Sequence, residues 1–121
     1  MTDTILDRAA LKRLLNVIGG DFEDFDEIKQ EFLETSPDLI ADLKNAAANG
    51  DVDAMRIASH SLKGNARDFG ANGLAEASEQ LEHACKDAAA MSDAAALVTS
   101  VVQAEAETRQ ALAELKAADL G

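Results

Sequence analysis

The residues best suited to chemistry in this 121-residue chain surround one histidine in a stretch of helical character. Arg56 lies four residues before His60, and Lys63, Gly64 and Arg67 follow it at three, four and seven residues. At about 100° per residue in a helix, all four fall within about 100° of arc around the imidazole. The spacing therefore predicts one helix face that carries a histidine, three cations and a glycine.

This face departs from the charge of the chain as a whole. The sequence holds 23 acidic and 11 basic residues, which gives a formal net charge of −12. Three cations beside one imidazole would favour its neutral form, because like charge opposes protonation. A neutral imidazole keeps the nitrogen lone pair that a nucleophile needs, and the cations could balance an anion attached there. The pattern favours a phosphoryl group, whose oxygens accept several charge-assisted hydrogen bonds.

Spacing alone leaves two interpretations of this face open. An exposed histidine with basic neighbours is often an ordinary solvated surface, on which Arg56 would pair with a carboxylate of a neighbouring helix. Glycine is about 1 kcal/mol less favourable than alanine in a helix, so Gly64 needs a reason. It could permit close packing between helices, or the close approach of a partner or a phosphoryl group. Because Gly64 points away from the expected core, we favour the approach of a partner.

Composition limits the class of protein. Apolar residues make up 47% of the chain and aromatic residues only 3%, and the helix formers dominate, which predicts an all-α fold. The acidic charge argues against nucleic acids and anionic membranes, and no apolar run approaches the ~20 residues of a membrane span. The N-terminus lacks the pattern of a signal peptide. Cys85, the single cysteine, excludes an internal disulfide and a multi-cysteine metal site, so we expect a cytoplasmic protein.

Apolar residues at intervals of three and four predict the helices that must position the histidine. We expect a single domain over residues 1–121, built as an antiparallel up-down four-helix bundle with an additional short N-terminal helix. Pro37 should kink or divide the second helix. The Ala-rich stretch 88–96 is interpreted as a turn. The N-terminal helix is expected at about 4–18 and the bundle at about 21–117, with helices over 21–49, 52–69, 72–89 and from Ser92 or Asp93 to about 115.

The helix that carries His60 also has an expected buried face. His60 points about 130° away from the centre of this face. The face consists of Val52, Met55, Ser59, Leu62, Ala66 and Phe69. The aromatic residues of the preceding helix are most simply core, although one or two could form an apolar docking patch; they are Phe22, Phe25 and Phe32.

The stretch around His60 resembles the histidine-containing phosphotransfer (HPt) domains of bacterial two-component phosphorelays. The family pattern is roughly H-x-L-K-G, then five variable residues, a glycine and a small residue. The resemblance extends over about residues 20 to 115, nearly the whole chain. The positions that fill the pattern are His60, Leu62, Lys63, Gly64, Gly70 and Ala71.

The resemblance implies roles for several residues. His60 would accept a phosphoryl group on Nε2 from a receiver-domain aspartate and pass it to another response regulator. Lys63 would contact the phosphoryl oxygens, with Arg56 and Arg67 as supporting cations, and Gly64 would let the receiver dock. Some relatives carry a glutamine that is hydrogen-bonded to the imidazole, and by position this place falls at Glu82, which could fix the tautomer of the ring.

The same resemblance has implications for cofactors, for kinase activity and for binding partners. We expect a monomeric phosphocarrier with no kinase activity of its own, no cofactor and no metal, whose partners are receiver domains of response regulators or hybrid histidine kinases. Magnesium would belong to the receiver. Two alternatives stay open: a non-catalytic helical adaptor that binds a receiver or kinase through the same face, and a dimeric phosphotransfer module. His83 is interpreted as a surface histidine near carboxylates, in preference to a second phosphorylation site or a metal ligand.

Overall fold

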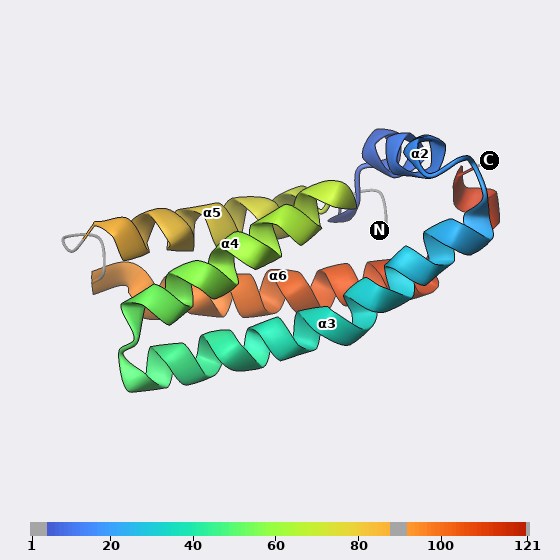
Figure 1. Cartoon of the computed structure of the whole chain (residues 1–121). Coiled ribbons are helices and arrows are strands. Elements are labelled where there is room, and N and C mark those ends of the chain that lie inside the picture. Colours follow the sequence, from blue (N-terminus) through green and yellow to red (C-terminus); the bar gives the residue numbers. More distant parts are fainter. Residues whose placement is uncertain (1–4, 88–91, 121) are drawn as a thin grey trace.

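Four long helices lie alongside one another, and a shorter helix packs across one end of them (Figure 1). The computed structural model describes residues 5–87 and 92–120, and within these ranges all regular structure is helical. Successive long helices run in opposite directions (Figure 1), which confirms the predicted up-down bundle. The elements are α2 (Arg8–Val17), α3 (Phe22–Asn49), α4 (Val52–Asp68), α5 (Asn72–Lys86), α6 (Ala94–Glu114) and the 3-10 helix η2 (Ala117–Leu120).

Capping residues begin α3, end it and begin α4 at the positions that the sequence predicts. The Asp21 carboxylate accepts a hydrogen bond from the backbone N–H of Glu23 at 2.8 Å, and α3 follows. Gly50 ends α3 with a left-handed backbone, φ 67°, which glycine adopts without strain. The Asp51 carboxylate then accepts from the N–H of Ala54 at 3.0 Å and starts α4. The turn is therefore short, and it sets α4 directly against α3.

Of the two outcomes predicted for Pro37, a kink or a division of the second helix, the division does not occur. α3 is one continuous helix with Pro37 inside it. Proline removes a single N–H from the hydrogen-bond ladder, at a cost of about 3 kcal/mol in an isolated helix. Here α3 packs against both α4 and α6, and this packing offsets the loss.

Three helix ends differ from the sequence expectation. Asp7, with extended backbone, caps α2, so this helix begins at Arg8; the predicted start at residue 4 lies outside the described residues. Ala71 is the N-cap of α5, and Asn72 is its first residue. The predicted end of this helix at residue 89 also lies outside the described residues, although Asp87 already has extended backbone. Residues 94–96, expected in a turn, belong to α6.

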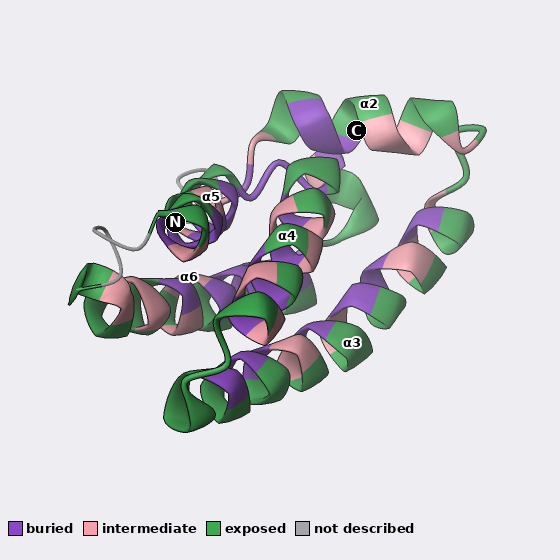
Figure 2. Ribbon diagram, turned by 60° about the vertical axis from the view of Figure 1, so that its left-hand side comes forward, coloured by how far each residue is buried: buried purple, intermediate pink, exposed green. Residues whose placement is uncertain are grey.

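The core follows the inner faces of the four long helices (Figure 2). The predicted buried face of α4 is confirmed at Met55, Ser59, Leu62, Ala66 and Phe69, which are all buried. Val52 is the exception, with 37% of its surface exposed, because it is the first residue of α4 and lies at the edge of the bundle. Among the phenylalanines of α3, the core interpretation is confirmed for the two that are buried and make edge-to-face contacts with Phe69, namely Phe25 and Phe32.

Gly70 joins the α4–α5 turn to the N-terminal segment. Its φ is +66°, and a Cβ added here would lie 2.7 Å from the Ala10 Cβ and 2.9 Å from the Asp7 carbonyl oxygen. The Gly70 carbonyl oxygen accepts a hydrogen bond from the Asp7 N–H at 2.9 Å. The second glycine of the motif therefore has a structural reason, since it lets α2 close the end of the bundle.

Across the described ranges, no helix has both the length and the apolar character needed to cross a membrane.

Candidate functional site

His60 stands on the outer face of α4, as the helical spacing predicts. Its side chain is 66% exposed. Leu62 and Ala66 on the same helix are fully buried, and they hold α4 in the bundle while the imidazole stays at the surface. The ring is therefore accessible to a second protein.

Glu82 of α5 reaches the imidazole from beneath. Its carboxylate is buried, with 5% of the side chain exposed. One oxygen, Oε2, lies 2.9 Å from His60 Nδ1, and the other accepts a hydrogen bond from Lys63 Nζ at 2.5 Å. Lys86, one turn further along α5, lies 3.8 Å from the same carboxylate. The contact that the sequence suggested between Glu82 and the ring is thus present, and one carboxylate joins three cationic or imidazole groups.

The state of this carboxylate determines the tautomer of the ring. The hydrogen bond from Lys63, and then that from His60, lower the pKa of Glu82 from 4.5 to about 2, although burial opposes this change. Glu82 is therefore ionised at neutral pH and can only accept hydrogen bonds. It follows that His60 Nδ1 carries the proton of this contact. The lone pair of the neutral ring then lies on Nε2, which is the nitrogen that a nucleophilic role requires.

Each of the three cations that the spacing places on the face of His60 has a carboxylate partner. Lys63 is bound by Glu82, as described above. Arg56 donates to Asp53 on its own helix at 2.8 Å, and this hydrogen bond raises the pKa of the guanidinium. Arg67 lies 3.6 Å from Glu79 of α5. Asp53 lies on α4 itself, whereas Glu79 and Glu82 lie on α5, so spacing along α4 does not show the partners of Arg67 and Lys63.

The open side of the site lies at Gly64. The residue is exposed, and a Cβ added to it would meet no heavy atom within 4 Å among its non-local neighbours. Close packing between helices therefore does not explain this glycine. Because Gly64 has no side chain, the surface one turn after His60 on the same face of α4 is open.

Two residues near the site were missed by the sequence interpretation. Lys86 could have been found as the residue four positions after Glu82, on the same face of α5. Ile57 is a large apolar side chain that is 53% exposed, three residues before His60. The signal for Ile57 was an apolar residue outside the stripe of threes and fours.

The other residues that the sequence singled out lie apart from this network. His83 is 72% exposed, and its Nε2 lies 3.9 Å from Glu79. Cys85 is half-buried, and burial raises the pKa of its thiol, which disfavours the reactive thiolate. In the part of the chain that the structure describes, no group of three histidine, cysteine or acidic residues is arranged to hold a metal ion.

Comparisons with known proteins show the family and the fold of this chain. The sequence model of the Hpt domain matches residues 27–118, which is most of the chain. The fold is similar to the crystal structure of histidine-containing phosphotransfer protein B from Pseudomonas aeruginosa PAO1, with a TM-score of 0.82 and 25% sequence identity, over 91% of this chain and 92% of that one. A search of curated proteins finds no match. The family match and the structural similarity together show that the chain belongs to the Hpt domain family.

Proposed function

We propose that this protein carries a phosphoryl group on His60 Nε2 between receiver domains of a phosphorelay. The neutral imidazole attacks the phosphorus of a receiver's aspartyl phosphate. The N–P bond forms as the P–O bond to the aspartate breaks, and the receiver recovers a free carboxylate. The next receiver's aspartate reverses these steps and takes the group away. Membership of the Hpt domain family supports this reaction type.

The observation that carries the proposal is the hydrogen bond between Glu82 and His60 Nδ1. It leaves Nε2 as the free nitrogen on an exposed ring. When Nε2 becomes phosphorylated, the ring keeps its Nδ1 proton and gains positive charge, and the buried carboxylate beside it stabilises that charge.

Lys63 is the cation placed to meet the phosphoryl oxygens, because it lies one turn from His60 and shares the same carboxylate. Arg56 is partly exposed and pairs with Asp53, and Arg67 is exposed and pairs with Glu79, so we assign both a supporting part in the charge of the surface. Transfer between two such groups depends mainly on positioning and charge, which a small rigid site supplies.

The partner would supply the rest of the site. Receiver domains are the partners of Hpt domains in phosphorelays, and magnesium would be held by the receiver's own acidic residues. The sequence carries no P-loop or kinase-type motif. Our proposal is a carrier without kinase activity of its own that acts as a cytoplasmic monomer.

The test is phosphorylation of the protein by a phosphorylated receiver domain. His60→Gln should remove the acid-labile label and leave the fold intact, as judged by circular dichroism. His83→Gln is the matched control, since it removes the other histidine, which is also exposed. Label of equal strength on His60→Gln, or loss of label on His83→Gln alone, would contradict the assignment. Receiver binding without any label would favour the adaptor alternative.

A further inference from the structure

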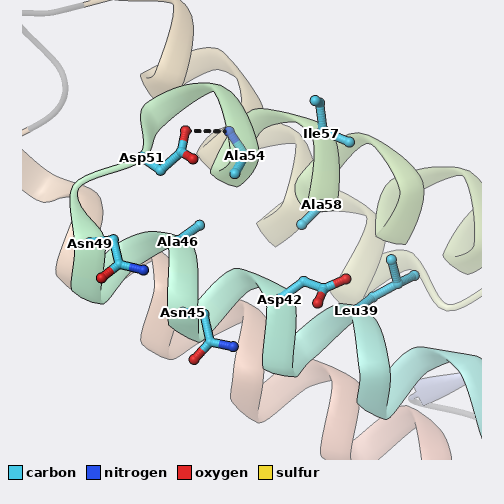
Figure 3. A pocket seen from close by; sticks show the side chains of 9 residues that line it. All are labelled: Leu39, Asp42, Asn45, Ala46, Asn49, Asp51, Ala54, Ile57 and Ala58. Carbon is cyan, nitrogen blue, oxygen red and sulfur yellow. Dashed lines mark hydrogen bonds between the residues drawn. The ribbon is translucent and has the colours of Figure 1, made fainter.

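A groove runs between α3 and α4 on one side of His60. It has a volume of about 360 Å³. In Figure 3, Leu39 and Asp42 extend from α3 toward α4, and the Ala58 methyl group points back toward α3. The residues that line the groove are Leu39, Asp42, Asn45, Ala46, Asn49, Asp51, Ala54, Ile57 and Ala58.

The groove is continuous with the surface that carries the histidine. Ile57 precedes His60 by three residues, so the two side chains are neighbours on α4. Gly64 follows Ile57 by seven residues and lies on almost the same line of the helix. This line passes on the α3 side of His60, whereas Lys63 and Glu82 lie on the α5 side. A partner that covers Ile57 and the open space at Gly64 would therefore stand directly beside the imidazole.

The lining combines apolar side chains with acidic ones. Ile57 is 53% exposed and Leu39 is partly buried, which leaves apolar surface that the fold itself does not cover. Asp42 and Asp51 supply carboxylates at the margin, and Asp42 is exposed. The groove thus matches an aliphatic side chain next to a lysine or arginine, because such a pair would cover the apolar surface and meet the acidic margin.

The shape favours a protein surface over a small molecule. A small-molecule site encloses most of its ligand, whereas this groove has walls on two sides only, formed by α3 and α4. Its charged residues lie where the rim of a protein interface usually carries them.

We propose that this groove docks an element of the receiver domain that presents an aliphatic side chain beside a cationic one, and that Ile57 and Asp42 select which receivers transfer phosphoryl to His60. The inference rests on the proposed function. In this arrangement Lys63 and Glu82, on the α5 side of His60, support the transfer, and Ile57 and Asp42, on the α3 side, bind the receiver.

The experiment measures phosphoryl transfer from an isolated, phosphorylated receiver domain over a range of receiver concentrations. Ile57→Ser should raise the concentration needed for half-maximal transfer by about tenfold, since it removes a half-exposed aliphatic side chain from the contact. Val17→Ser is the matched control, because Val17 is an exposed aliphatic residue on α2 and outside the groove.

The acidic margin is tested by charge reversal. Asp42→Lys should weaken transfer at low salt, and the loss should shrink at high salt because screening removes the repulsion. Changing the receiver's matching lysine or arginine to aspartate should restore transfer to Asp42→Lys. Glu107→Lys on α6 makes the same charge change at an exposed position away from the groove and should have no such effect.

Two failures can be told apart. Labelling of the unmodified protein by phosphoramidate, a small donor that needs no docked protein, reports whether His60 accepts a phosphoryl group. If neither phosphoramidate nor any receiver labels His60, the proposed function fails and the docking inference falls with it. If His60 is labelled but Ile57→Ser and Asp42→Lys behave like the unmodified protein, the groove is not the docking site and the phosphocarrier function stands.

Discussion

Glu82→Gln separates the charge of the buried carboxylate from its shape, because an amide resembles a protonated carboxyl group in size and neutrality. In the folded protein the pKa of Glu82 falls from 4.5 to about 2, chiefly through the hydrogen bond from Lys63. At about 1.4 kcal/mol per pKa unit, this difference corresponds to roughly 3 kcal/mol of folding free energy that depends on the ionised form. We therefore expect Glu82→Gln to lower the free energy of unfolding by roughly 3 kcal/mol at neutral pH.

The same contribution has a defined pH dependence. A carboxyl group with a lowered folded-state pKa stabilises the fold above its unfolded pKa of 4.5, and this stabilisation is lost as the pH falls toward about 2. The difference in unfolding free energy between the original protein and Glu82→Gln should be complete above about pH 5. Below pH 4.5 it should shrink steadily, because the carboxyl group of the unfolded chain takes up a proton there while the folded protein keeps Glu82 ionised until about pH 2. Urea unfolding followed by circular dichroism at closely spaced pH values measures both curves.

Glu107→Gln provides the control for this measurement. Glu107 is exposed on α6, and its substitution should change stability by no more than about 0.5 kcal/mol. A difference between Glu82→Gln and the original protein that stays constant from neutral pH down to about pH 3 would refute the assigned role of the carboxylate charge.

The remaining predictions concern the motif and its lysine. Gly64→Ala should stabilise the protein by about 1 kcal/mol in urea unfolding, because the added methyl group meets no neighbour, yet it should slow transfer from a receiver; a loss of stability would contradict this account. Gly70→Ala should destabilise the fold by at least about 1–2 kcal/mol, since its left-handed backbone and its contact with Ala10 exclude a methyl group; unchanged thermal unfolding would show that the turn can adjust. Lys63→Ala should slow phosphoryl transfer without abolishing it and should raise the pKa of Glu82 in an NMR titration; an unchanged rate would remove Lys63 from the mechanism.

Most of the fold could be predicted from the sequence, because both the faces of the helices and their ends have clear signals in it. Apolar residues recur at threes and fours, and Asp21, Gly50 and Asp51 supply local caps whose effect does not depend on the rest of the protein. Pro37 was harder to interpret. Its local preference disrupts a helix, but packing of α3 against two neighbours outweighs that preference, and packing is not visible in a local pattern.

A second feature that local patterns could not reveal is the buried polar contact between α3 and α6. Glu105 is 1% exposed, and its carboxylate accepts hydrogen bonds from Ser36 at 2.7 Å and from Arg109 at 2.6 Å. A glutamate in a helix is ordinarily taken as a surface residue. Arg109 lies four residues along the same helix, but only the register of α3 against α6 shows that Ser36 lies within reach and that Glu105 is buried.

The candidate site also has features that the sequence predicts and features that depend on packing between helices. The exposed position of His60 follows from the angle between it and the apolar stripe, so one helix is enough to predict it. Glu82 was placed beside the ring through the resemblance to a known family. The pairing of Arg67 with Glu79 needs the register of α5 against α4, which neither spacing nor composition contains.

The register of α5 against α4 places carboxylates beside the cations around His60. Three cations on one helix face would attract a phosphoryl group strongly and hold it, whereas a carrier must also release it. In the proposed reaction the phosphoryl oxygens draw Lys63 away from Glu82, and at the same moment the phosphorylated ring becomes cationic at the nitrogen that already faces this carboxylate. Glu82 therefore exchanges one positive neighbour for another and remains paired in both states. We expect a site balanced in this way to allow the group to arrive and to leave, because Glu82 stays paired with a positive group in both states.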